Sequence, residues 1–461
     1  MKTVAGLYPL TDVETGRVDA LAHGGGALLT ETVRACGLDV LLSQALASWS
    51  KPLARHDPAK VVLDLALSLA VGGDCLADVS LLRAEPQVFG PVASAPTLSR
   101  VLATLAADAS ALERAVALAR ARARRAAWTL AGSGAPTAAT SAQRPLVIDI
   151  DATLVTAHSD KKGAAPTFKK GFGFRPLTAR VDHGPQGAGE SATIMLRPGS
   201  AGSNTAADHE AVTAAVPTQV GLGPRPGRKV VVRTDAAGGT KAALAALERR
   251  RVSCSVGFTL PSDMSRIYRL VPAQAWTPAY NADGDPREAA DVAELTDLLD
   301  LDGRPKAVRV IVGRERPHPG AHPRLDDVDG YRLTAFATST RIGQLADLEV
   351  RHRQRARCED RVRCAKDTGL DRMPLQAFAA NRIWCQVVAL ARDILAWTQM
   401  PRLADHPARR WEPKAVRHRL LNVPAVIARH ARRTTTRYKT SSPFADLLTP
   451  AISNLRAHAD P

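Results

Sequence analysis

The sequence predicts a mixed α/β protein built from several domains, and three observations support this prediction. The chain has 461 residues, which is too long for a single small domain. Hydrophobic residues make up 45% of it, enough to bury substantial cores. The pattern also changes along the chain, from apolar residues at helical spacing before residue 130 to short β-branched runs after residue 145.

Residues 1–130 are predicted to form a helical DNA-binding domain. An apolar-periodic run over 58–71 follows Asp57 and ends before Gly72, and an Ala/Arg-rich helix is expected over 111–128. Short helices broken by Gly, Pro and Asp are typical of helix-turn-helix DNA-binding domains. An ordinary helical bundle would show nearly the same pattern, so both interpretations remain open.

The rest of the chain divides into five parts by composition. Residues 131–144 are small, polar and rich in Pro and Gly, which is typical of a linker. Residues 145–260 follow the order three strands, helix, strand, helix, strand, which predicts a mixed sheet with acidic residues at strand ends. Residues 261–342 are irregular and should form an inserted subdomain. Residues 343–374 should be dominated by one charged helix, and 375–461 should be helical and basic.

The charge of the chain points to a polyanionic partner. Sixty-two Lys and Arg residues against 45 Asp and Glu residues give a formal net charge of +17. A membrane surface is the less suitable partner, because the most apolar run, 61–71, is too short to span a bilayer and contains Asp64. Nucleic acid is therefore the expected partner.

The cysteines indicate a reducing environment. Six cysteines in so long a chain are sparse, and no C-x-x-C pair occurs among them. A disulfide framework or a zinc ribbon is therefore not expected, and we predict a cytoplasmic protein.

Three carboxylates stand out as candidate metal ligands. Asp151 follows the first strand, Asp235 ends the fourth strand, and Glu359 sits in a helix otherwise rich in arginine. Mg²⁺ prefers carboxylate oxygens, and a pair of such ions is suited to a phosphodiester displacement. Asp149 lies two residues before Asp151 on the same strand face, so either could be the ligand. Taken singly, an Asp at a strand end is more often a cap or turn residue, and Glu359 is most simply an ion-pair partner on a solvated helix face.

The arginine-rich helix carries its charges along one stripe. His352, Glu359 and Lys366 recur every seven residues, and Arg355 lies one turn before the glutamate. One acid within a cationic stripe suits a metal ligand flanked by phosphate contacts.

These residues resemble the DDE-type insertion-sequence transposases, whose catalytic core has the ribonuclease H-like (retroviral-integrase-like) fold. One clan of that family places its third acid in a Y-x-x-R-x-x-x-E-x-x-x-x-x-x-K signature, matched here by Arg355, Glu359 and Lys366, with His352 in place of Tyr. The x-Thr that often follows the first acid favours Asp151 over Asp149. The strings GGDCLADVSLLR, APTLSR and LRPGSAGSNTAADH resemble the insertion-sequence group called thirteen-eighty.

The resemblance implies a fold, a reaction and partners. It implies a ribonuclease H-like core with a mostly β insertion, and an enzyme in which Asp151, Asp235 and Glu359 hold two Mg²⁺ ions, with Mn²⁺ as a substitute. The reaction would be end cleavage and strand transfer of double-stranded DNA, namely terminal inverted repeats and a target. A homodimer in the paired-end complex and a bacterial, nucleoid-associated location are further expectations, with no role for a membrane.

Further basic and aromatic residues are candidate DNA contacts. His352, Arg355 and Lys366 would lie near the scissile phosphate in the resemblance. Trp276, in the insertion, is a candidate stacking residue for a flipped base, although a half-buried core position is the simpler interpretation. The remaining candidates are basic residues of two segments, namely Lys161, Lys162, Lys169 and Lys170, and Arg432, Arg433, Arg437 and Lys439.

Two other functions remain open at this point. A ribonuclease H-like nuclease would cut DNA without strand transfer. A DNA-binding regulator would have lost catalysis, although all three acids are present in this chain.

Overall fold

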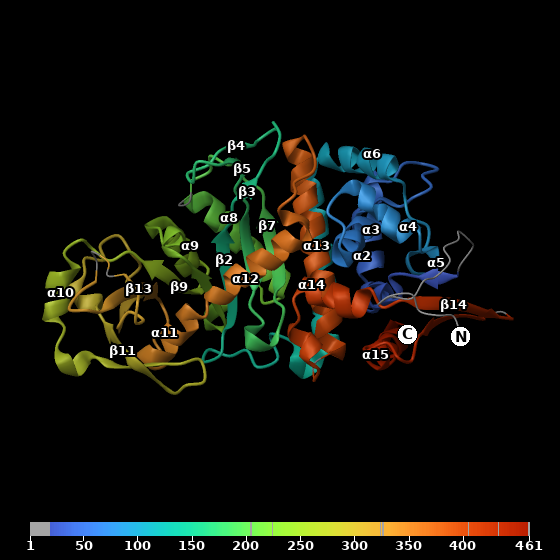
Figure 1. Cartoon of the computed structure of the whole chain (residues 1–461). Coiled ribbons are helices and arrows are strands. Elements are labelled where there is room, and N and C mark those ends of the chain that lie inside the picture. Colours follow the sequence, from blue (N-terminus) through green and yellow to red (C-terminus); the bar gives the residue numbers. More distant parts are fainter. Residues whose placement is uncertain are drawn as a thin grey trace, which may run out of the picture.

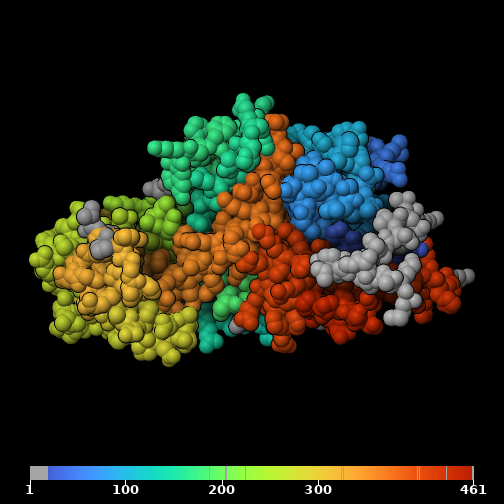
Figure 2. Space-filling view, in the orientation of Figure 1, coloured from blue at the N-terminus to red at the C-terminus, as the bar shows by residue number. Residues whose placement is uncertain are grey.

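The computed structural model describes residues 19–202, 205–223, 225–322, 324, 327–403, 405–431 and 433–459. A large sheet runs through one half of the molecule, and helices make up most of the other half (Figure 1). The space-filling view shows the same order, with the 261–342 segment in yellow at one end and the blue N-terminal helices and red C-terminal residues at the other (Figure 2).

The main sheet has nine strands in the order β10-β11-β12-β13-β9-β8-β2-β6-β7. Strand β8 pairs in parallel with β2 on one side and with β9 on the other, and the other pairs in the sheet are antiparallel. The strands are β2 (Leu146–Ala152), β6 (Leu177–Val181), β7 (Glu190–Met195), β8 (Val230–Thr234), β9 (Ser253–Phe258), β10 (Thr277–Tyr280), β11 (Pro286–Glu294), β12 (Arg309–Glu315) and β13 (Arg332–Thr338). A mixed α/β fold, as predicted from the sequence, is confirmed.

The 261–342 segment continues the core sheet instead of forming a sheet of its own. Its last strand, β13, pairs antiparallel with β9, from Ala335 opposite Phe258 to Thr338 opposite Ser255. This pairing gives the backbone groups at the edge of β9 hydrogen-bond partners, which a free edge would lack. The segment also contains helix α10 (Met264–Leu270).

The two faces of the core strands differ in character. Ile148 and Ile150 of β2 are buried in the main apolar core, as the period of two along a strand predicts. Asp149 and Asp151 point to the opposite face, where α11 (Leu345–Arg353) and α12 (Ala356–Ala365) lie. Helix α8 (Ala206–Val220) packs on β6 and β7, and α9 (Lys241–Arg249) packs on β9.

The N-terminal region is helical, as predicted. Its helices are α1 (Ala27–Ala35), α2 (Leu38–Ala45), α3 (Pro58–Val71), α4 (Val79–Arg83), α5 (Pro86–Phe89), α6 (Ala95–Ala106) and α7 (Ala109–Ala131). Helix α3 has the predicted bounds, because the Asp57 carboxylate accepts a hydrogen bond from the amide of Ala59 and Gly72 ends the helix.

Helix α13 (Phe378–Arg402) joins the two halves of the molecule. It packs against α7, α3, α1 and α6 on one side and against β7 on the other. Trp384 and Trp397 are fully buried along it. The main apolar core therefore includes residues of both halves of the molecule.

The C-terminal region contains strands as well as helices. Beyond α14 (Pro413–Val416), strands β14 (Ala425–His430) and β15 (Arg433–Tyr438) form a hairpin that β1 (Ala20–Leu21) extends, and α15 (Ala445–Ala459) packs on α1. The prediction of a helical tail missed this hairpin. β-branched residues at Val426, Ile427 and 434–436 favour the extended conformation. Three further short strands, β3 (Val155–Thr156), β4 (Ala165–Pro166) and β5 (Phe172–Phe174), form a small separate sheet.

No single helix among the described residues is long and apolar enough to cross a membrane, although α3 and the segment Leu76–Arg83 meet the test together across a 94° bend.

A buried acid in α3 makes the stability of the fold depend on pH. Burial raises the pKa of Asp64 to about 6, and the nearby Lys60 opposes this shift only in part. Since the folded state then binds a proton more tightly than the unfolded state between pH 3.8 and 6, stability falls as pH rises through that window. We expect the unfolding free energy of Asp64→Asn, relative to the wild type, to rise by on the order of 3 kcal/mol between pH 4 and pH 7 in urea titrations.

Ser68→Ala is the control for this measurement. Ser68 is buried one turn further along the same helix and has no titratable group, so its difference from the wild type should stay constant with pH. A constant difference for Asp64→Asn as well would contradict the prediction.

Candidate active site

Asp151 and Asp235 lie at the ends of two neighbouring parallel strands. In the β2–β8 pairing, Asp149 stands opposite Arg233, so the acids two residues further along each strand emerge at the same edge. Asp235 also caps the short turn after β8, where one of its carboxylate oxygens accepts a hydrogen bond of 3.3 Å from the amide of Gly238. This edge is where open α/β sheets place their sites.

Asp149 is committed to a buried ion pair. Its two carboxylate oxygens accept hydrogen bonds from Nε and Nη2 of Arg233, at 2.6 and 2.8 Å. Arg233 donates a further bond of 3.0 Å to Asp182. Asp151, by contrast, has a side chain that is 15% exposed and is bonded to one arginine. The geometry therefore favours Asp151 over Asp149 as the acid available to a ligand.

Arg355 stands between Asp151 and Glu359. Its Nη2 donates a hydrogen bond of 2.9 Å to Oδ1 of Asp151, and its Nη1 lies 3.9 Å from Oε1 of Glu359. The side chain of Glu359 is 73% exposed. Within the described part of the chain, the three acids do not form a group of ligand atoms close enough to share one ion. A cation thus already bridges two of the predicted ligands.

The electrostatics couple the two aspartates. Burial raises the pKa of Asp151 to about 6, the positive charge of Arg355 opposes this shift, and the negative charge of Asp235 adds to it. When a partly desolvated carboxylate lies beside another carboxylate, a cation placed between them stabilises the ionised form of both. Perturbed acids of this kind are typical of functional sites.

The arginine-rich segment forms two helices rather than the one predicted. Arg233 donates a hydrogen bond to the carbonyl of Arg351, which in an unbroken helix would accept from the amide of Arg355. That amide bonds to the carbonyl of His352 instead, at 2.9 Å, and α12 begins at Ala356. The predicted stripe is therefore interrupted between His352 and Glu359.

His352 points inward, towards the sheet. Its ring stacks on Phe336 with centroids 4.5 Å apart, and its Nδ1 lies 3.0 Å from the hydroxyl of Ser255. Burial and the nearby Arg233 lower the pKa of His352 to about 3, so the ring is neutral at physiological pH. These contacts give His352 a packing role in this structure.

Lys366 ties α12 to the loop after β2. Its Nζ donates a hydrogen bond of 2.7 Å to the carbonyl of Leu154 and lies 3.6 Å from a carboxylate oxygen of Asp371. Lys366 is therefore bonded to the loop that follows Asp151.

The four lysines predicted to contact DNA lie around the small sheet of β3, β4 and β5. Lys162, Lys169 and Lys170 are exposed. Lys161 is partly buried, and its Nζ donates to the carbonyl of Met373, so its charge is directed into the protein. Three of the four are thus available on the surface.

Trp276 packs within the 261–342 segment. Its ring lies 5.6 Å from that of Tyr268, and the guanidinium of Arg314 covers it at 4.2 Å. The indole joins an apolar cluster with Met264. This position supplies packing contacts and does not border the cavity beside Glu359 described below.

The basic residues of the C-terminal hairpin lie at the end of the molecule away from the 261–342 segment (Figure 1). Arg433, Arg437 and Lys439 are exposed. Arg432, also predicted to contact DNA, lies outside the described residues.

Several arginines near the acids carried no signal in the sequence. Arg175 is close enough to Asp151 and Asp235 to interact electrostatically with both carboxylates. Its guanidinium carbon lies 4.5 Å from the centroid of the Phe168 ring. Arg180 is buried beside Asp151, and its Nε and Nη2 have no hydrogen-bond partner in the described structure. The two arginines therefore place positive charge close to the acids. Their identity as site residues follows only from the β2–β6 pairing, which brings distant segments together.

A cavity of about 530 Å³ adjoins Glu359. It lies between α11, α12 and the strands of the 261–342 segment. Its basic lining residues are Arg287, Arg316, Arg332, Arg353 and Arg355. Arginine side chains therefore extend from the acids towards the inserted strands, although Arg287 and Arg353 pair there with Glu349.

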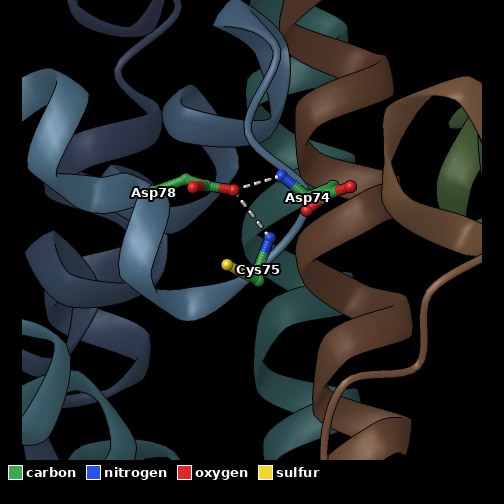
Figure 3. Close-up of side chains that lie close together, drawn as sticks. All are labelled: Asp74, Cys75 and Asp78. Atoms are coloured by element: carbon green, nitrogen blue, oxygen red, sulfur yellow. Dashed lines mark hydrogen bonds between the residues drawn. The ribbon is translucent and has the colours of Figure 1, made fainter.

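A second group of three possible ligands lies elsewhere, in the N-terminal helices. Figure 3 shows Asp74, Cys75 and Asp78 close together. One carboxylate oxygen of Asp78 accepts hydrogen bonds from the amides of Asp74 and Cys75, at 2.8 and 3.1 Å. Asp74 also pairs with Arg372 at 2.9 Å. The group therefore caps a short helix, and its contacts are those of a cap.

The sequence matches the family model of the transposase DDE domain, group 1, over residues 15–460. No curated protein matches the chain significantly. Among solved structures, the chain is similar to the piggyBac transposase in its synaptic complex with hairpin DNA, with a TM-score of 0.41 and 9% identity over 94% of this chain and 84% of that one. Since the family model covers nearly the whole chain, the protein belongs to the DNA transposases that carry a DDE domain of group 1.

Proposed function

We propose that this transposase binds the terminal inverted repeats of its own insertion sequence and moves the element by a cut-and-paste route. The observation that carries this proposal is the placement of Asp151 and Asp235 side by side at the ends of β2 and β8, with Glu359 linked to Asp151 through Arg355. Family membership implies the use of a divalent metal.

The residues at this edge fit a divalent metal. A guanidinium cation already lies between carboxylates of Asp151 and Glu359, so a positive charge at this position is compatible with the surrounding structure. Asp149 would take no part, because both its oxygens are bonded to Arg233. We propose Asp151, Asp235 and Glu359 as the ligands of two Mg²⁺ ions, for which Mn²⁺ could substitute. Bound there, such ions would activate a water or hydroxyl nucleophile and stabilise charge on the leaving oxygen.

The surrounding cations would hold the DNA strand. Arg175 lies near both aspartates, and Arg355 would be released towards a phosphate once the acids bind metal. Lys366 would keep the loop after β2 in place through the Leu154 carbonyl. Exposed Lys162, Lys169 and Lys170 would contact the phosphate backbone beside this edge. Two copies of the chain would act together on the paired ends.

A single assay separates transposition from simple cleavage. Purified protein is incubated with Mg²⁺, a duplex that ends in the inverted repeat flanking its gene, and a supercoiled target plasmid. We expect cleavage at the repeat and joining of its 3′ end to the plasmid. Cleavage without joined product would indicate a nuclease, and binding without cleavage would indicate a regulator.

Arg355 should compete with metal for the acids. We expect Arg355→Ala to bind Mn²⁺ about tenfold more tightly than the wild type in the absence of DNA, because removing a cation 2.9 Å from Asp151 leaves its carboxylate uncompensated. Isothermal titration calorimetry measures this affinity directly. Arg363→Ala is the matched control, since Arg363 lies on the same helix and pairs with Glu412 instead. Equal affinities for the Arg355 variant and the wild type would contradict the proposed ligand set.

A further inference from the structure

A two-stranded antiparallel ribbon projects from the C-terminal part of the molecule. It comprises residues 425–439, that is β14, its turn, β15 and Lys439 (Figure 1). Its register runs from Ala425 opposite Tyr438 to His430 opposite Arg433. We refer to residues 425–439 as the ribbon.

The base of the ribbon is fixed to the protein core. Ala425 and Ile427 pack with Leu21 of β1, and β1 pairs with the first residues of β14. The hydroxyl of Tyr438 donates a hydrogen bond of 2.9 Å to the carbonyl of Gly24, and burial raises the pKa of this hydroxyl to about 12. Gly24 allows the close approach, because a Cβ there would lie 2.6 Å from Cβ of Ala425. The ribbon therefore starts from a rigid support.

The outer face of the ribbon is cationic and open. Side chains that alternate along β15 share one face, and Arg433, Thr435 and Arg437 on that face are all exposed. Lys439 continues the same alternation. In the described structure the side chains of Arg433, Arg437 and Lys439 make no hydrogen bond or ion pair within the chain. The ribbon contains five Lys and Arg residues and no Asp or Glu, so its charge is not balanced locally.

The dimensions of the ribbon match a groove of duplex DNA. Two strands about 4.8 Å apart, with their side chains, fill roughly the ~12 Å width of the B-form major groove. Between Arg433 and Arg437 the ribbon rises about 13 Å, which places both arginines within one groove segment. Two-stranded ribbons are an established way for proteins to enter this groove.

We propose that the ribbon inserts its outer face into the major groove of the transposon DNA, away from the site of strand cleavage. Arg433 and Arg437 are placed to donate to guanine O6 and N7, and Thr435 to contact a thymine methyl group. Lys439 lies where it can neutralise a phosphate. A-form RNA is a poorer partner, because its major groove is too narrow and deep for side chains to read. The inference rests on the proposed function for the identity of the DNA.

The test measures the affinity of the full chain for duplex DNA. The probe is a fluorescein-labelled 40-base-pair duplex carrying the inverted repeat, titrated at 150 mM salt and over a series of salt concentrations. We expect Arg433→Ala/Arg437→Ala to bind at least tenfold more weakly than the wild type, as the loss of two base contacts predicts. The control is Arg266→Ala/Arg269→Ala, which removes the same charge from two exposed arginines of α10. We expect the control to bind within threefold of the wild type.

A modified probe tests whether the ribbon binds in the major groove. Replacing guanine with 7-deazaguanine removes the N7 acceptor from the major groove. This change should weaken binding of the wild type and leave the double ribbon variant unaffected. Unchanged affinity of the ribbon variant, an equal loss in the α10 control, or indifference of the wild type to 7-deazaguanine would each overturn the proposal.

The same variant keeps the two proposals distinguishable. At saturating duplex, Arg433→Ala/Arg437→Ala should retain the wild-type rate of cleavage while its KM rises, because the ribbon lies apart from Asp151 and Asp235. If the wild type binds the duplex through the ribbon and cleaves nothing, the proposed function fails and the ribbon assignment stands. If the variant loses dimerisation in gel filtration and keeps full DNA affinity, the open edge of β15 pairs with a second copy, and the groove assignment fails.

Discussion

Asp151→Asn and Asp235→Asn should each reduce metal-dependent cleavage and joining of the inverted-repeat duplex by on the order of 1,000-fold. Each change removes one negative charge from the edge where β2 and β8 end, and a metal site that loses a charged ligand forfeits several kcal/mol of transition-state stabilisation. The measurement is the rate of single-turnover cleavage in Mg²⁺ on a sequencing gel.

Glu359→Gln should show a loss of similar size, although its side chain is 73% exposed in this structure. Asp360→Asn is the matched control, because this neighbouring acid pairs with Arg363 on the outer surface of α12. It should cleave at the wild-type rate. Full activity in Asp235→Asn would remove the basis of the proposed site, and equal losses in the Asp360 control would show that the charge of α12 matters generally.

Asp149→Asn separates the structural acid from the catalytic one. Because Asp149 is buried against Arg233, its loss should lower the melting temperature more than Asp151→Asn does. Differential scanning fluorimetry of the two variants tests this order. A larger effect for Asp151→Asn would contradict the assignment of Asp149 to the ion pair.

Patterns in the sequence predicted the elements whose bounds depend on neighbouring residues. Helix α3 begins and ends where Asp57 and Gly72 predict, since a cap acts on residues within one turn. Strands β2 and β8 were identifiable from their β-branched runs, and each does end near an acidic residue. The candidate acids could therefore be named before the fold was known.

Long-range contacts determine what the patterns missed. The break before α12 depends on a hydrogen bond from Arg233 to the carbonyl of Arg351, which lies 118 residues away in the sequence. The position of Arg355 between two acids depends on a partner 204 residues away. Arg351 and Arg355 do not differ in type from the other arginines of the 343–374 segment, so nothing in the sequence distinguishes them. Sequence spacing alone therefore placed a charged stripe where the structure has two helices and an internal cation.

The junction between the helical half and the sheet contains a buried cluster of charges. Removing one of these charges should lower the stability of the fold substantially. Oε2 of Glu190 accepts a hydrogen bond of 2.5 Å from Arg124 and one of 2.8 Å from Trp397, and its Oε1 accepts one of 2.7 Å from Trp128. Arg124 also donates to Asp393 at 2.7 Å. Helices α7 and α13 and strand β7 are thereby joined at a point with no access to solvent.

Glu190→Gln should destabilise the fold by about 3–5 kcal/mol, because it leaves Arg124 buried with half of its compensating charge removed. Urea unfolding followed by tryptophan fluorescence measures the change, and Trp128 and Trp397 report on the cluster itself. The control is Glu210→Gln, whose partner Arg249 is exposed on the surface. It should cost less than about 1 kcal/mol.

The destabilisation should also depend on pH in a defined direction. Burial alone would raise the pKa of Glu190, but Arg124 and His183 outweigh it and hold this pKa well below the usual range. An acid of lowered pKa contributes stability that is present above its unfolded pKa of about 4.3 and is lost as pH falls further. The gap between the wild type and Glu190→Gln should therefore be widest above pH 5 and should narrow as the solution is acidified below pH 4. A gap that widens on acidification would mean that Glu190 is protonated in the folded protein, and that the junction is held by neutral hydrogen bonds instead of paired charges.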